Sequence, residues 1–487
     1  MPFEGYLDAA SETEVAGWVY HGDDANTPLT VEIVDDGNVI ATVLAGVFRE
    51  DLLAAGKGNG NHAFRFSMPQ GQRAKSRLRA RVAGQPWFIQ LCTEAYSRAF
   101  AFMRHTCEYG IPEPPFGFAD VPAPDPQTEI PLANRLIAAY HRASRADSKR
   151  DKPEDQWTFL ERSIFPDFID IIQKKDAQAF ADYMRCFFAR SISHGTFQGA
   201  MATAGLENPG SAASVAGRTV DALASLCESI GLLRVENPEQ GHYGENLFRT
   251  PDDLVNLLES FLKIDVVPPN ASGRKFGIHT RKGILALTDV RALYAARRIQ
   301  EIIGPVSRSS VCEIGGGIGG VAYYCHLLGI RDYTIIDLPA ISVMQGYWLS
   351  RALPDAPLVL FGESDPGGPA IRLAPPSRYG KSRFNLVFNQ DSFPEMHREH
   401  ALAYLRRARR IAPALLSINQ EGENPQTINS HQTVVADLVA VVSGYRRIYR
   451  CHHWLRPGYV EELYRVQWRS FRTVAGMALR VIRRRLG

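Results

Sequence analysis

The sequence lacks the features of a disulfide-rich, membrane-spanning or strongly charged protein. Its seven cysteines are scattered and form no CxxC pair, so neither a disulfide framework nor a structural zinc site is expected. There is no uninterrupted apolar run of about eighteen residues, and no basic region followed by an apolar stretch near Met1. A net charge of +3 over 487 residues gives no overall case for nucleic-acid binding. We therefore expect a cytoplasmic protein that binds no nucleic acid.

The chain is too long for a single hydrophobic core, and its pattern changes along its length. Residues 1–92 predict an all-β unit. "LTVEIVDDGNVIATVLA" alternates apolar and polar residues on both sides of Asp36 and Gly37, which is typical of a β-hairpin. "GYLD…VAGWVY" and "VEIVDDGNVIATVLAGVFREDLLAAGKGNGNHAFRF" together resemble a β-sandwich module attached to bacterial glycosyltransferases and other surface-polysaccharide enzymes.

The remaining chain divides into four further segments. Residues 93–131 form a proline-rich connector, which favours an extended spacer. Residues 132–305 place apolar residues at three- and four-residue spacing, which predicts an α-helical lid or oligomerisation region. Residues 306–464 alternate short apolar strands with helical stretches, which indicates a parallel sheet with helices on both faces. Residues 465–487 contain seven arginines and no acid, which favours a basic amphipathic helix able to contact a membrane surface.

"VCEIGGGIGGVAYY" contains five glycines in the six residues from Gly315 to Gly320. The glycines stand between an apolar strand and a helical stretch, where a ligand can meet backbone N–H groups at the positive end of the helix. The next strand ends at Asp337, and an acid at that place suits the two hydroxyls of a ribose. Together these features predict a cofactor that contains a nucleoside.

The spacing of the glycines is compatible with two kinds of cofactor. Gly315, Gly317 and Gly320 fit the dinucleotide pattern GxGxxG. The run Glu-x-Gly-x-Gly-x-Gly from Glu313 to Gly319 instead resembles the first motif of class I S-adenosylmethionine (SAM)-dependent methyltransferases. The resemblance implies that SAM is the cofactor and that the carboxylate of Glu313 lies near its ammonium end or near a loop that orders that end.

A closer resemblance rests on three separate strand ends. "CEIGGGIGGVAYY", "YTIIDLPAISVMQGYWLS" and "FNLVFNQDSFPEM" look, in this order, like the bacterial sugar O-methyltransferases of surface-polysaccharide gene clusters. The resemblance implies a methyl transfer to a sugar hydroxyl of a surface glycan or its precursor. It also implies that Glu313, Gly315, Gly317 and Asp337 hold the cofactor. Gly319 of the same turn and Asn389 at a later strand end are further candidate cofactor-binding residues.

Polar side chains follow the fourth and fifth apolar strands of this region, where the carboxyl ends of parallel strands meet. Asp391 or His397 is our candidate for the base that takes the proton of the hydroxyl. Asp391 is equally well placed to cap the following helix, and His397 is more typical of an exposed helix face. Asn389 and Asn419 are expected to position cofactor or acceptor.

Further residues are expected to bind the acceptor, from the strand ends and from loops of the helical region: Glu395, Asn419, Glu421, His431, Tyr243 and Arg281. Asp391, Glu395, Glu421 and His431 would also suit a divalent cation such as magnesium or manganese. Their spacing does not require one, so no metal ligand is assigned.

The sequence thus predicts a multidomain α/β protein with a C-terminal Rossmann-like class I methyltransferase sheet, preceded by an α-helical region and an N-terminal β-sandwich. We expect a homo-oligomer that acts on a sugar or glycan, which could be lipid-linked. Two alternatives stay open: an NAD(P)-dependent oxidoreductase acting on a nucleotide sugar, and a non-catalytic glycan-binding protein.

Overall fold

The computed structural model describes residues 3–35, 38–75, 78–85, 89–91, 115–147, 164–195, 209–236, 246, 249–304, 309–422 and 433–467. The chain divides into unit 1, Met1–Cys107, and unit 2, Glu108–Gly487. Among the described residues, no helix combines the length and the apolar character needed to cross a lipid bilayer.

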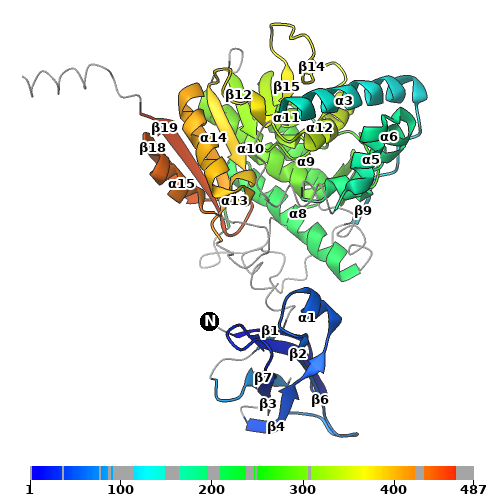
Figure 1. Cartoon of the computed structure of the whole chain (residues 1–487), viewed down its shortest axis with the longest axis vertical. Coiled ribbons are helices and arrows are strands. Elements are labelled where there is room, and N and C mark those ends of the chain that lie inside the picture. Colours follow the sequence, from blue (N-terminus) through cyan, green and yellow to red (C-terminus); the bar gives the residue numbers. More distant parts are fainter. Residues whose placement is uncertain are drawn as a thin grey trace, which may run out of the picture. The chain divides into compact units, whose positions relative to one another are not determined.

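Unit 1 contains two sheets around one apolar core, and their strands pair antiparallel except for β8, which is parallel to β1 (Figure 1). The strand order is β5-β6-β2-β1-β8 in one sheet and β4-β3-β7 in the other. Its elements are β1 (Phe3–Ala10), β2 (Glu14–His21), β3 (Leu29–Asp35), β4 (Asn38–Ala45), β5 (Val47–Phe48), α1 (Glu50–Ala54), β6 (Asn61–Ser67), β7 (Arg79–Val82) and β8 (Gln90–Leu91). Strands β3 and β4 pair antiparallel as expected, with Asp35 opposite Asn38. Within this core, Val19 and Ile33 are fully buried.

Unit 2 begins with elements that differ from the expected proline-rich spacer. Strand β9 (Phe116–Phe118) pairs with β10, and helix α3 already starts at Pro126. Pro131 lies inside that helix, where the ring removes one backbone donor without ending the helix. The helical region then comprises α3 (Pro126–Asp147), α5 (Pro166–Lys174), α6 (Ala177–Met184), α8 (Pro209–Ser229), α9 (Pro251–Leu262), and α10 (Leu287–Ile303), with the short strands β10 (Phe276–Thr280) and β11 (Gly283–Leu285) before α10.

The larger sheet has eight strands in the order β14-β15-β13-β12-β16-β17-β19-β18 (Figure 1). These strands are β12 (Ser310–Ile314), β13 (Asp332–Ile336), β14 (Leu358–Val359), β15 (Ile371–Ala374), β16 (Leu386–Gln390), β17 (Ala414–Gln420), β18 (Tyr445–His452) and β19 (Tyr459–Val466). Strands β12 to β17 run parallel, but β19 is antiparallel to both of its neighbours. The sheet is therefore mixed: the parallel strands agree with the sequence pattern, and the antiparallel strand β19 at this edge was not predicted.

Helices cover both faces of this sheet, which gives it two apolar layers. One layer joins Val311 and Phe388 to helices α10, α11 (Gly320–Leu327) and α12 (Pro339–Ala352). The other layer joins Cys312 and Val387 to α14 (Arg398–Ile411) and α15 (Val435–Val442). Alternate residues of each strand thus face opposite layers, which explains why these strands read as continuous apolar runs.

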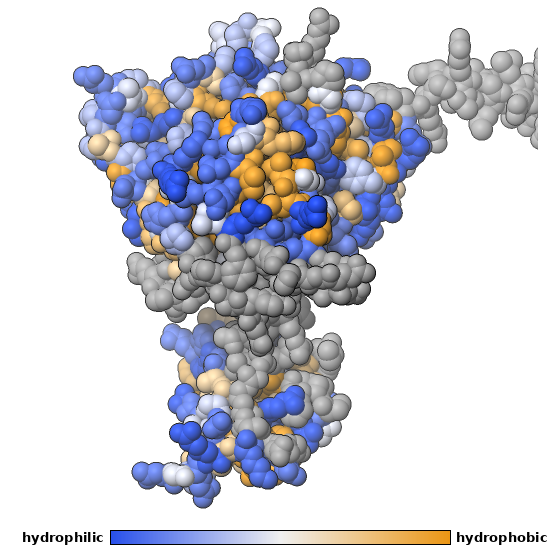
Figure 2. Space-filling model, turned by 180° about the vertical axis from the view of Figure 1, so that it is seen from behind, coloured by the Kyte–Doolittle hydropathy of each residue, from blue (hydrophilic) through white to orange (hydrophobic). Residues whose placement is uncertain are grey.

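Apolar side chains also gather near the middle of one face of unit 2, between hydrophilic residues (Figure 2). Apolar areas of this kind are frequent at protein–protein contacts. The homo-oligomer expected from the sequence stays a prediction. The basic segment expected at residues 465–487 lies outside the described residues beyond Gln467.

Candidate functional site

A cavity of about 210 Å³ lies at the carboxyl ends of the central strands. Strand β12 has β13 on one side and β16 on the other, so the chain order reverses here. Open α/β sheets bind ligands in the crevice at such a reversal. Residues from all three strand ends line the cavity, together with side chains from α10, α13 (Ser392–Glu395) and α14.

The glycine turn follows β12 as the sequence predicted, and it lines the cavity through Gly315, Gly316, Gly317 and Gly320. Part of the reason for glycine is internal packing. Gly315 has φ +73°, and a Cβ atom there would lie 2.4 Å from the Ser392 side chain. Gly319 also has positive φ but faces Leu349 and does not line the cavity.

Asp337, at the end of β13, lines the cavity and also holds the glycine turn. Its carboxylate accepts hydrogen bonds from the backbone N–H of Gly316 at 2.8 Å and of Leu338 at 2.8 Å. The Gln345 side chain donates a third at 2.7 Å and also donates to the carbonyl of Gly317. Burial raises the pKa of Asp337 to about 6, although these three donors oppose the rise. Gln345, which the sequence did not predict, thus holds both Asp337 and the glycine turn from outside the cavity lining.

Glu313 lies below the turn with only 2% of its surface exposed. Its Oε2 accepts a hydrogen bond from the Tyr333 hydroxyl at 3.0 Å. Burial, with the nearby charge of Asp337 as a further cause, raises the pKa of Glu313 to about 8. The side chain is therefore mostly protonated at pH 7, and a cationic ligand group beside it would favour loss of the proton.

Asp391 also lines the cavity, directly after β16. Its backbone has φ +66° and ψ −36°, a conformation that is uncommon for any residue with a side chain. Nη1 of Arg456 donates to both carboxylate oxygens, at 2.9 and 2.8 Å. Asp391 precedes α13, but its side chain makes no capping hydrogen bond there. The capping role considered from the sequence is therefore wrong.

The structure separates the other predicted residues into those at the cavity and those elsewhere. Glu395 lines the cavity, whereas His397 caps helix α14 by accepting from the N–H of Glu399, away from the lining residues. Glu421 forms an ion pair with Arg450 at 2.6 Å. Arg281 is 86% exposed and pairs with Asp252. Neither of the last two lines the cavity.

Asn389 and Asn419 are buried and bind other parts of the chain. Asn389 donates to the carbonyl of Ile314 at 2.9 Å, and Asn419 donates to Asn389 Oδ1 at 3.0 Å. They tie the ends of β12, β16 and β17 together and do not line the cavity. Tyr243 and His431 lie outside the described residues.

Several cavity residues carried no signal in the sequence. They come from α10, α14 and the turn between β18 and β19: Thr288, Asp289, Arg291, His400, Tyr404 and Arg456. Asp289 pairs with Lys275 at 2.6 Å, and both are 3% exposed. His400, three residues after the candidate His397, is the histidine of this segment that lines the cavity.

In the described part of the chain, no group of three or more His, Cys, Asp or Glu side chains could hold a metal ion. His431, one of the four possible ligands named from the sequence, is not among those residues. The cavity lining does fit a nucleoside cofactor. Asp337 borders it beside the apolar side chains of Ile336, Leu338 and Ile341.

No family model and no curated protein matches the chain. Solved structures with partial likeness include magnesium protoporphyrin IX methyltransferase from Synechocystis PCC 6803 with bound SAM (12% identity, TM-score 0.27), covering 37% of this chain and 82% of that one. Others are the ribosomal protein L11 methylase from Lactobacillus delbrueckii subsp. bulgaricus (11%, TM-score 0.26, 37% and 80%) and an O-methyltransferase family protein from Burkholderia thailandensis (11%, TM-score 0.27, 38% and 60%). At these values the likeness establishes no family and no activity, so the site rests on its own geometry.

Proposed function

We propose that the chain is a SAM-dependent O-methyltransferase that acts on a sugar hydroxyl. The observation that carries this proposal is one cavity at the chain reversal between β12 and β16. Its first half is formed by the glycine turn and Asp337, and its second half contains Asp391. A nucleoside cofactor and an acceptor would therefore meet in a single cavity.

The strand order supports a methyltransferase over a dinucleotide-dependent oxidoreductase. The dinucleotide-binding sheet has the parallel order 3-2-1-4-5-6. Here β19 is inserted antiparallel between β17 and β18. A reversed strand in this place is the arrangement expected of the class I methyltransferase sheet, in agreement with the motif that begins at Glu313.

In the cofactor half, the carboxylate of Asp337 would accept hydrogen bonds from the ribose hydroxyls. The same carboxylate holds the glycine turn. Glu313 would lie toward the ammonium end, below the glycines. When bound, SAM would supply an electrophilic methyl group. The protein's part is to hold the acceptor oxygen in line with that methyl and to exclude water.

In the acceptor half, Asp391 is the proposed base. As the new C–O bond forms and the C–S bond of the cofactor breaks, the hydroxyl proton would pass to this carboxylate. Arg456 fixes the carboxylate orientation through its two hydrogen bonds, and the side chain of Asp391 remains 40% exposed. An uncommon backbone conformation at a cavity residue is often associated with such a role.

The sugar acceptor rests on the resemblance of three strand ends to bacterial sugar O-methyltransferases. An acceptor linked to a membrane lipid would suit the basic C-terminal segment. The test is mass spectrometry of surface polysaccharide from a deletion strain. We expect each sugar residue that is normally methylated to lose the mass of one CH₂. Expression of the wild-type chain should restore this mass, and expression of an Asp391→Asn variant should not. An unchanged polysaccharide would contradict the sugar assignment.

A further inference from the structure

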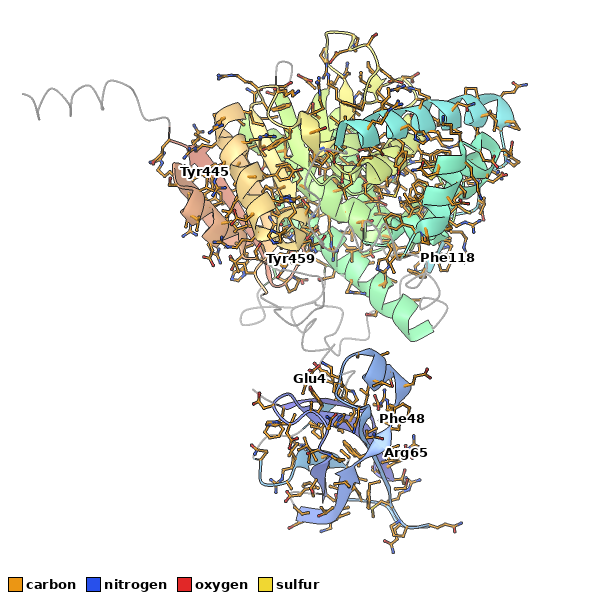
Figure 3. All side chains as sticks on the ribbon, viewed as in Figure 1. Glu4, Phe48, Arg65, Phe118, Tyr445 and Tyr459 are labelled. Carbon is orange, nitrogen blue, oxygen red and sulfur yellow. The ribbon has the colours of Figure 1, made fainter. Side chains whose placement is uncertain are left out.

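Two arginines line the acceptor half of the cavity although they lie far apart in the sequence. Arg291 belongs to α10, and Arg456 belongs to the turn between β18 and β19. Tyr459, at the start of β19, lies at the same edge of the sheet as α13 (Figure 3). The Arg456 guanidinium lies over its ring, 3.3 Å from the centroid. The position of Arg456 is thus fixed from two sides, by this stacking and by Asp391.

Arg291 lacks an anionic partner within the part of the chain that the structure describes. Its Nε atom is buried without a hydrogen-bond partner. The charged groups that act on it include Arg456 and Arg218, which lower its pKa, and the carboxylate of Asp391, which raises it. Burial, and then the charge of Arg456, lower the pKa of Arg291 to about 9. It therefore stays charged at neutral pH, in surroundings with too little negative charge.

The carboxylate of Asp391 already forms an ion pair with Arg456. Nη1 of Arg456 makes both hydrogen bonds, which leaves the Nη2 and Nε donors for another acceptor. His453, close to both arginines, does not add to the charge. Its pKa is lowered to about 3 by burial and then by Arg456 and Arg291, so the imidazole is neutral. Arg291 and Arg456 are therefore two charged guanidinium groups at one cavity, whose lining also contains the carboxylates of Asp391 and Glu395.

We propose that the acceptor carries an anionic group, a phosphate or a carboxylate, which Arg291 and Arg456 bind. This inference rests on the proposed function and adds the chemical class of its substrate. Guanidinium groups bind oxyanions through paired, charge-assisted hydrogen bonds. An oxyanion here would supply the missing partner of Arg291 and fix the acceptor against Asp391. A neutral sugar would leave the buried Nε atom of Arg291 without an anionic partner.

The first test is isothermal titration of the protein loaded with S-adenosylhomocysteine (SAH), using glucose, glucose 1-phosphate and glucuronate. We expect the charged sugars to bind more tightly than glucose, and the better of the two identifies phosphate or carboxylate. Arg291→Gln should weaken the charged sugar by roughly tenfold or more. Arg291→Lys should weaken it less, and the exposed Arg383→Gln should not change it. Equal affinity for glucose, or no binding of either charged sugar, would overturn the inference.

The second test distinguishes the acceptor's anion from the carboxylate of the cofactor's own methionyl group. SAH retains that carboxylate, whereas 5′-methylthioadenosine lacks it. If Arg291 binds the acceptor, Arg291→Gln should leave the affinities for both compounds unchanged. A loss of SAH affinity with unchanged methylthioadenosine affinity would assign Arg291 to the cofactor and overturn the inference. Absence of SAH binding to the wild-type protein would instead contradict the proposed function itself. Thermal unfolding of each variant shows that it is folded.

Discussion

Nη1 of Arg456 donates hydrogen bonds to both carboxylate oxygens of Asp391 at the acceptor half of the cavity. The two residues are 65 positions apart in the sequence, so the pair exists only because the turn between β18 and β19 reaches the end of β16. It holds the one candidate base that the sequence predicted and that the structure also places in the cavity.

Asp391→Asn should reduce methyl transfer by roughly 10²–10⁴-fold, because the amide keeps the shape but accepts no proton. The affinity for SAH should stay within about threefold, since Asp391 lies in the acceptor half. Transfer of a labelled methyl group to the acceptor measures the first quantity, and titration measures the second. His397→Gln is the matched control, as His397 does not line the cavity. A full rate in Asp391→Asn would transfer the role to Glu395 or His400.

Gly315→Ala tests whether the turn requires a residue without a side chain at this position. Both Gly315 and the exposed Gly367 have positive φ, +73° and +75°, but only Gly315 has a neighbour within 4 Å of the added Cβ. Gly367→Ala should therefore cost about 1 kcal/mol of unfolding free energy from backbone strain alone. Gly315→Ala should cost more, because Ser392 must move, and it should reduce SAH affinity. Chemical denaturation of the two variants measures the difference, and equal costs would show that the predicted clash is absent.

Glu313→Gln should change how stability depends on pH. Burial raises the pKa of Glu313 from 4.5 to about 8, so the folded state binds this proton more tightly than the unfolded state does. The resulting stability is fully present below pH 4.5 and is lost as the pH rises through about 8. Relative to wild type, Glu313→Gln should therefore gain roughly 3–5 kcal/mol between pH 4.5 and 8.5. Urea denaturation across this range measures it. Parallel curves for the two proteins would mean that Glu313 is not buried as a titrating group.

The sequence was sufficient for features that are local to one strand or turn. The glycines after β12, Asp337 after β13 and Asp391 after β16 each follow an apolar run, and parallel strands bring such ends together.

The features that the sequence did not predict depend on long-range contacts. Arg291 and Arg456 come from a helix and a hairpin turn without any pattern that marks them as cavity residues. Strand β18 has a mostly exposed, charged sequence, so its pattern did not predict a strand of the sheet. Asn389 and Asn419 follow the pattern of site residues, yet they bind neighbouring strand ends. The sequence does not show whether a polar side chain at a strand end faces the cavity or a neighbouring strand.

The central claim is that the turn after β12 holds an adenosine-containing sulfonium cofactor. The direct measurement is isothermal titration of the full chain with SAH, NADH and NADPH. We predict that SAH binds with one site per chain, that Asp337→Ala loses at least about tenfold in affinity, and that neither nicotinamide cofactor binds. Binding of NADH or NADPH without SAH, or SAH binding that is unchanged in Asp337→Ala, would contradict the account.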